Sequence, residues 1–168
     1  MSYLKRLIVE TPDFPRPGIL FRDISPLLRT HFEVTIDALE ALFTDEEWNE
    51  IDALCGIESR GFILASALAV RRNMGFVPIR KQGKLPPPVV ELAYDLEYGT
   101  GSLEMHTGHG RLLLIDDVLA TGGTLRAAAD LSQLAGYEVH GLGVLIDLKL
   151  AGEFSWGRHH ARSVIQYG

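Results

Sequence analysis

The stretch LLLIDDVLATGGTLRAA, residues 112–128, constrains the fold more than any other part of this chain. Four apolar residues lead into two adjacent carboxylates, then into a loop of small residues and glycines, then into a helical pattern. A short apolar run bounded by turn signals predicts a buried strand. A buried strand that leads through a loop into a helix is typical of α/β proteins with a parallel sheet.

The same alternation of strand and helix recurs along the chain. Apolar runs predict strands at 51–57, 76–80, 111–116, 138–146 and 162–167. Apolar residues at helical spacing predict helices at 30–49, 62–72 and 123–135. We therefore expect an α/β fold, in which helices flank a central, mainly parallel and twisted sheet.

Two segments do not follow this alternation. Residues 11–26 contain four prolines, which favour an extended chain, so residues 1–29 are predicted to form an arm or hood over the domain. Residues 81–88 contain enough Gly and Pro to prevent regular structure, and residues 94–106 alternate on both sides of Gly-Thr-Gly like a hairpin. Residues 81–108 are therefore predicted to form a mobile flap.

Composition limits the class of protein. With 168 residues, 46% hydrophobic and 23% charged, the chain is expected to form one domain over 1–168. A net charge of -6 argues against a nucleic-acid-binding body. Cys55 is the single cysteine, so no internal disulfide forms, as expected in the cytoplasm. The longest apolar stretch is too short to cross a bilayer, so we expect no membrane partner.

The junction at 116–124 predicts a binding site. Asp116 and Asp117 come at the carboxyl end of a predicted strand, where open parallel sheets bind ligands. Ionised carboxylates only accept hydrogen bonds, so they suit the hydroxyls of a ribose. The backbone N–H groups of a loop at a helix N-terminus suit a phosphate. We expect this loop to consist of Ala120, Thr121, Gly122, Gly123 and Thr124.

The alternative is an ordinary tight turn. Such a turn needs one glycine and gains nothing from two flanking aspartates, and carboxylates beside a buried strand are costly without a partner. The nucleotide-binding patterns G-x-x-x-x-G-K-[ST] and G-x-G-x-x-G are both absent from the chain. The junction therefore favours a phosphorylated sugar as the ligand.

Residues 112–124 resemble the phosphoribosyl pyrophosphate (PRPP) signature of type I phosphoribosyltransferases. The stretches DFPRPGILFRDISP, ESRGF, IRKQGKLP and YDLEYGTGSLEMH are similar to the adenine phosphoribosyltransferase family, in its order and over nearly the whole chain. The resemblance implies the type I phosphoribosyltransferase fold and transfer of the 5-phosphoribosyl group of PRPP to N9 of adenine. AMP and pyrophosphate would be the products, and a homodimer is expected.

The resemblance also implies where pyrophosphate binds. The residues are Glu58, Ser59, Arg60, Arg80, Lys81 and Lys84. It places Arg60 near the base as well, with a catalytic role, and it implies that Arg80 reaches across the dimer interface into the neighbouring site. The alternatives are a helix-capping turn with a surface arginine at 58–60 and a solvated cationic loop at 80–84.

Glu97 is the candidate acid/base residue, because transfer to N9 requires proton transfer on the imidazole ring of adenine. Tyr98 is expected to close the flap and exclude water. The resemblance places Phe21 and Val118 on either face of adenine, and the backbone groups of Leu20 and Arg22 at its edge. The alternatives are a solvated acidic hairpin face for Glu97 and a structural anchor for Phe21.

Magnesium is implied as the cofactor, held mainly by PRPP and water rather than by direct protein ligands. The histidine-containing stretches HTGH and HH lack matching partners for a transition-metal site. Two other functions stay open: a transferase for another purine base, and a PRPP-binding regulator without turnover. No basic helix-turn-helix precedes the PRPP signature, which argues against the regulator.

Overall fold

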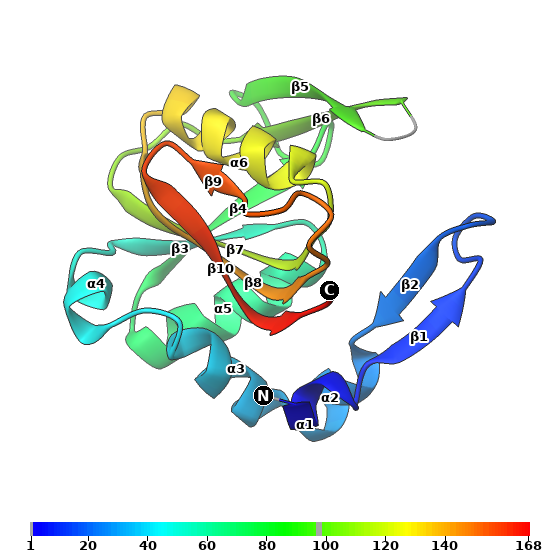
Figure 1. Cartoon of the computed structure of the whole chain (residues 1–168). Coiled ribbons are helices and arrows are strands. Elements are labelled where there is room, and N and C mark those ends of the chain that lie inside the picture. Colours follow the sequence, from blue (N-terminus) through cyan, green and yellow to red (C-terminus); the bar gives the residue numbers. More distant parts are fainter. Residues whose placement is uncertain (1, 97–98) are drawn as a thin grey trace.

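A single eight-stranded sheet lies at the centre of the computed structural model, which describes residues 2–96 and 99–168 (Figure 1). Its strands are β3 (Ala53–Ile57), β4 (Gly75–Lys81), β5 (Val90–Leu96), β6 (Gly99–Met105), β7 (Arg111–Leu119), β8 (Glu138–Asp147), β9 (Ser155–Trp156) and β10 (His159–Gln166). The helices are α1 (Ser2–Lys5), α2 (Ser25–Thr30), α3 (Phe32–Glu40), α4 (Asp45–Asn49), α5 (Arg60–Arg72) and α6 (Gly123–Leu134).

The strand order is β5-β6-β4-β3-β7-β8-β10-β9. Strands β4, β3, β7, β8 and β10 run parallel, while β6, β5 and β9 are antiparallel to their neighbours. The predicted α/β fold with a mainly parallel sheet is confirmed. The short antiparallel strand β9 was not predicted, because two residues are too few to give a pattern.

The apolar run of β7 is buried on both faces of the sheet. Leu112 and Leu114 belong to the cluster that contains the apolar residues of α6. Leu113 and Ile115 belong to the cluster that contains those of α3 and α5. Because side chains alternate along a strand, a run of consecutive apolar residues is what a doubly covered strand needs. Figure 1 shows α6 on one face and α3 and α5 on the other.

The arm is an antiparallel hairpin of β1 (Val9–Pro12) and β2 (Leu20–Asp23) that projects from the body (Figure 1). The two strands agree with the extended chain predicted here. The prediction was wrong for the end of the segment, where Ser25 begins α2 with Pro26 in its first turn. Proline is tolerated there because the first helical N–H groups have no partner inside the helix.

The single helix predicted over 30–49 was also wrong, because α3 ends at Glu40 and a new helix, α4, begins at Asp45. Thr44 forms a capping box: its hydroxyl accepts from the Glu47 N–H at 3.3 Å, and Glu47 accepts from the Thr44 N–H at 2.8 Å. Trp48 of α4 is buried and donates to the Glu40 carbonyl at 3.0 Å. The sequence pattern that marks the start of the second helix is therefore Thr-x-x-Glu at residues 44–47.

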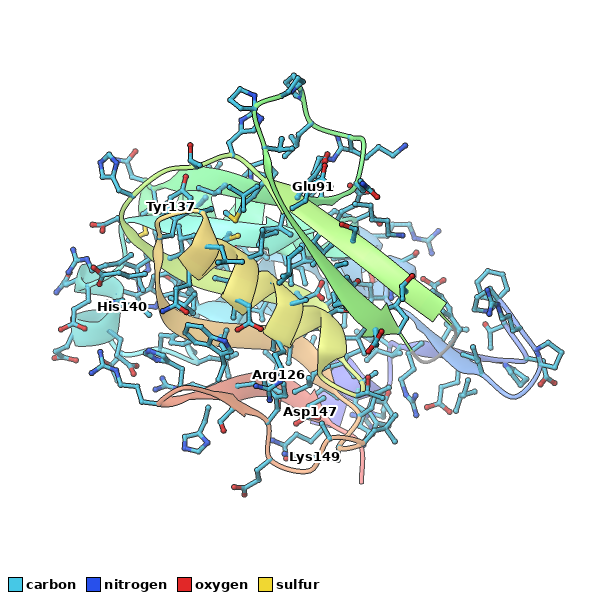
Figure 2. All side chains as sticks on the ribbon, turned by 90° about the horizontal axis from the view of Figure 1, so that it is seen from above. Glu91, Arg126, Tyr137, His140, Asp147 and Lys149 are labelled. Carbon is cyan, nitrogen blue, oxygen red and sulfur yellow. The ribbon has the colours of Figure 1, made fainter. Side chains whose placement is uncertain are left out.

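Strands β5 and β6 form the predicted hairpin, and β6 joins it to β4. The Gly-Thr-Gly stretch belongs to β6, where Gly101 pairs with Tyr94, so its placement at the turn was wrong. Helix α6 packs along this hairpin (Figure 2). In the described part of the chain, no helix is long and apolar enough to cross a membrane.

Two leucines of α6 test the assignment of its buried face. Leu131 is fully buried and Leu134 is 61% exposed. Leu131→Ala should lower the free energy of unfolding by about 2–5 kcal/mol, because it leaves a cavity in the core. Leu134→Ala, the same substitution one turn away, should change it by less than about 0.5 kcal/mol. Urea denaturation of both variants checks this, and equal losses would contradict the assignment.

Candidate active site

The predicted sugar site forms where β7 ends. β7 continues to Leu119, three residues beyond the predicted strand end, and pairs with β8 up to that residue. Asp116 and Asp117 therefore lie within the strand, close to its end. Both residues are only 7% exposed. Asp116 accepts a hydrogen bond from the Asp117 backbone N–H at 2.9 Å. The strand therefore holds two carboxylates in a largely water-excluded position.

The loop after β7 leads directly into α6. Gly122 is the residue before the helix and has φ of 89°, in the left-handed region that favours glycine. A Cβ at this position would lie 2.5 Å from a ring carbon of Phe154. Both the backbone angle and the space thus require glycine here. The result is a helix N-terminus without bulky side chains, which suits an anion.

This loop borders a cavity of about 340 Å³. Its lining brings together all seven residues predicted to bind the ribose and 5-phosphate of PRPP, two predicted pyrophosphate residues and one predicted adenine residue: Asp116, Asp117, Ala120, Thr121, Gly122, Gly123, Thr124, Glu58, Lys81 and Val118. A second cavity of about 390 Å³ shares part of the loop and is also lined by Pro15, Arg16 and Ile19 of the arm and by Asp95 and Leu96 of β5. The loop therefore lies between the arm and the flap hairpin.

Arg60 joins three parts of the predicted site. As the first residue of α5, it forms an ion pair with Asp117, with Nη2 and Oδ2 2.5 Å apart. Its Nη1 donates to the Arg22 carbonyl at 3.2 Å, and its guanidinium lies 4.9 Å from the centre of the Phe21 ring. Arg60 therefore connects the predicted adenine residues of the arm with the predicted ribose residue of β7.

A glycine after Arg60 allows this approach. A Cβ at Gly61 would lie 2.8 Å from Asp116 Oδ1 and 3.0 Å from the Ile115 carbonyl oxygen. Only a residue without a side chain lets α5 begin this close to β7. Ser59 precedes the helix and forms no side-chain cap. The capping-turn alternative for 58–60 therefore lacks the hydrogen bond that would define it.

The cationic segment at 80–84 is held by carboxylates. Arg80 Nε donates to Glu58 Oε2 at 2.9 Å, and the Lys81 N–H contacts the same oxygen at 3.3 Å. Arg80 Nη1 donates to the Lys84 carbonyl at 3.1 Å. Among the described residues that line the 340 Å³ cavity, Lys81 is present while Ser59, Arg80 and Lys84 are not. The segment is thus held by hydrogen bonds to carboxylates although residues 81–84 are exposed, and one of its cations lies at the cavity.

The arm carries a contact that sequence reasoning missed. The Tyr167 ring lies between two cations, with Lys5 Nζ 4.0 Å and the Arg22 guanidinium 4.1 Å from its centre. Arg22 also lies 3.5 Å from Glu10. Phe21 meets the Phe14 ring edge-to-face at 5.1 Å, and Leu20 is exposed. The C-terminal end of the chain, just after β10, therefore contacts the arm at Arg22, whose backbone is expected to lie at the edge of adenine.

Glu97 and Tyr98 lie outside the described residues. The strand residues that precede them, Tyr94 and Leu96, line the 340 Å³ cavity. The hairpin therefore brings the described part of β5 to the predicted PRPP site. The roles of Glu97 and Tyr98 stay predictions.

Asp116 and Asp117 differ in the charges that surround their carboxyl groups. Burial raises the pKa of the Asp116 carboxyl well above its ordinary value, and the neighbouring Asp117 carboxylate raises it further. Asp117 instead has the Arg60 guanidinium beside it. One carboxylate is thus balanced by a cation inside the protein, while the other gains from a ligand that donates hydrogen bonds or brings positive charge.

Asp116→Asn tests this cost of burial. Because folding raises the pKa of Asp116, the folded chain loses stability as the pH rises above the ordinary value of about 3.8, where the carboxyl ionises in the unfolded chain but not yet in the folded one. The variant should therefore gain free energy of unfolding over the natural chain, and the gain should grow as the pH rises above about 4. Glu153→Gln, at an exposed carboxylate, is the control. A difference that stays constant with pH in denaturation curves would refute the raised pKa.

Comparison with known proteins gives a consistent picture. The family model described as phosphoribosyl transferase domain matches residues 31–162. An adenine phosphoribosyltransferase from Hydrogenovibrio crunogenus is 53% identical over 98% of this chain and 96% of its own. Another from Bdellovibrio bacteriovorus is 48% identical over 98% of this chain and 99% of its own.

Solved structures agree with the sequence relatives. Adenine phosphoribosyltransferase from Rhodothermus marinus has a TM-score of 0.88 and 42% identity, covering 98% of this chain and 97% of its own. The Giardia lamblia enzyme, complexed with 9-deazaadenine, has a TM-score of 0.87 and 36% identity, covering 99% of this chain and 97% of its own. With the site geometry described above, these likenesses show that the chain belongs to the adenine phosphoribosyltransferase family.

Proposed function

We propose that this chain transfers the 5-phosphoribosyl group of PRPP to N9 of adenine, forming AMP and releasing pyrophosphate. The observation that carries the proposal is Arg60, which contacts Phe21, the Arg22 carbonyl and Asp117 at once. A base beside the arm and a ribose beside β7 would then be neighbours, as bond formation between them requires. The relatives named adenine phosphoribosyltransferase support the same reaction.

In this proposal the ribose hydroxyls bind Asp116 and Asp117, and the 5-phosphate binds the loop of residues 120–124. The two aspartates and the loop line one cavity, and the loop leads into the N-terminus of α6, which carries a partial positive charge. Pyrophosphate would lie against Glu58, Ser59 and Arg60 and against the cations Arg80, Lys81 and Lys84. Proximity of Lys81 and Glu58 to the same cavity supports this placement.

The bond to pyrophosphate breaks as the bond to N9 forms. Positive charge develops on the sugar, where the carboxylates of the site stabilise it, and negative charge develops on the leaving group, where cations stabilise it. We propose Glu97 as the acid/base group that accepts the proton lost by the imidazole ring of adenine when the bond to N9 forms. Phe21 and Val118 would stack on the base, with Leu20 and Arg22 at its edge, and Tyr98 would close the flap against water.

Magnesium completes the proposal. Over residues 2–96 and 99–168, no cluster of three His, Cys, Asp or Glu side chains could hold a metal ion by itself. The cavity lined by Asp116 and Asp117 is acidic and therefore fits a cation whose ligands come mainly from PRPP and water. When bound, magnesium would supply positive charge that neutralises the pyrophosphate.

We also propose a homodimer, and an exposed apolar face of α5 and β4 supports it. On α5, Val70 is 82% exposed and Ile63 is also exposed; on β4, Phe76 is exposed and its ring meets that of Phe62 edge-to-face. Arg80 lies at this face, over the Phe62 ring, as a residue that reaches a neighbouring site would. Cytoplasmic location and the absence of nucleic-acid and membrane partners stay predictions.

Incubation with adenine, PRPP and magnesium, followed by chromatographic detection of AMP, tests the reaction. We expect AMP to form and initial rates with hypoxanthine, guanine and xanthine to be at least about 100-fold lower, since a site built to pair the adenine edge leaves polar groups unpaired with other bases. A higher rate with another purine would assign the chain a different base. No product with any base, despite PRPP binding, would favour a regulator.

Two variants separate the proposed roles. Glu97→Ala should lower kcat about 100-fold or more, because it removes proton transfer, with little change in the affinity for PRPP. Asp117→Ala should instead raise the Kd for PRPP about tenfold or more, because it removes the acceptor of the ribose hydroxyls. Steady-state kinetics and calorimetry with PRPP check both. Near-natural constants for both variants would overturn the role assignments.

A further inference from the structure

Glu104 of β6 is a buried carboxylate that the proposed reaction does not use. It is only 1% exposed. Its Oε1 accepts from the Lys84 and Leu85 backbone N–H groups at 2.7 and 2.6 Å, and its Oε2 accepts from the Gly83 N–H at 3.0 Å. Three consecutive N–H groups of one loop therefore converge on a single carboxylate.

These bonds are strong enough to keep the carboxylate charged. Burial alone raises the pKa of Glu104, but the hydrogen bonds from Gly83, Leu85 and Lys84 outweigh it, and the pKa lies below its ordinary value. Arg80, which pairs with Glu104 in register on β4, acts in the same direction. Glu104 therefore accepts these bonds as an anion at neutral pH.

The loop that Glu104 holds contains Lys84 and directly follows Arg80 and Lys81, the last two residues of β4. Glu58 contacts Arg80 and the Lys81 N–H at one end of the segment, and Glu104 contacts residues 83–85 at the other. Lys81, between the two anchors, lines the cavity beside Asp117 and the phosphate loop. Gly83 has φ of 81°, so the chain turns sharply between the anchors. Two carboxylates thus determine the path of a cationic turn.

We propose that Glu104 is a positioning residue for pyrophosphate: by holding the backbone of 83–85, it keeps Lys81 and Lys84 placed for the leaving group of PRPP. This inference rests on the proposed function, because it takes the pyrophosphate to lie at these lysines. A turn of this composition, free of its anchor, would have to be ordered each time PRPP binds. The cost would fall on PRPP and pyrophosphate, and not on adenine or AMP.

Glu104→Gln is the variant that tests it, and Glu91→Gln is its matched control. Glu91, labelled in Figure 2, is the cross-strand partner of Glu104 on β5. It is exposed, and its Oε2 accepts from the Gln82 side-chain amide at 3.0 Å. Glutamine keeps the size of the side chain but turns one acceptor oxygen into a donor, which faces the loop N–H groups. The same chemical change at Glu91 leaves the three backbone bonds to Glu104 in place and alters only the side-chain bond from Gln82.

We expect Glu104→Gln to raise the KM for PRPP about fivefold or more, and the KM for pyrophosphate in the reverse reaction likewise. The KM values for adenine and AMP should change by less than about twofold, and Glu91→Gln should leave all four within that range. A rise shared by all four substrates, or no difference between the two variants, would overturn the proposal. If the natural chain forms no AMP at all, the proposed function fails instead.

Hydrogen exchange of the natural chain gives a readout that does not depend on the variant folding. Without ligand, the amides of Gly83, Lys84 and Leu85 should exchange at least about tenfold more slowly than those of an exposed loop, since each donates to a buried carboxylate. Exchange at the rate of an unstructured segment would mean that Glu104 does not hold the loop, and the proposal would fall.

Discussion

The ion pair between Arg60 and Asp117 is the contact on which the arrangement of the site depends. It joins the start of α5 to the end of β7, and the same guanidinium holds the arm through the Arg22 carbonyl. Two buried carboxylates side by side on one strand are costly, and a cation beside one of them reduces that cost. The guanidinium of Arg60 therefore connects α5, β7 and the arm.

The segment proposed to bind pyrophosphate has the opposite arrangement, in which carboxylates hold a cationic stretch of chain. Glu58 accepts from the Arg80 guanidinium and from the Lys81 backbone N–H at the end of β4, and Glu104 holds the turn that follows. One cation, Arg80, is thus ion-paired, and the backbone of the following turn is held by carboxylates, before any substrate binds. Such preorganisation suits a reaction whose transition state separates charge between a sugar and its leaving group.

Much of this fold follows from local patterns. The apolar run at 112–115 predicted β7 because both faces of the strand are covered, and the small residues at 120–124 predicted the start of α6. The pattern failed over 30–49, where helical spacing continues across two helices and only the Thr44 capping box marks the break. It also failed at Gly-Thr-Gly, since glycines mark turns and strand positions alike.

The charge relations could not be predicted, because they depend on which strands become neighbours. Glu104 has the sequence setting of an alternating polar residue in a hairpin, and its burial follows only from the pairing of β6 with β4. Tyr167 meets Arg22 only because β10 ends beside the base of the arm. Local sequence thus specifies which groups each element carries, whereas sheet order decides which of them share a charge or a hydrogen bond. For a site assembled from several strand ends, that second step determines the chemistry.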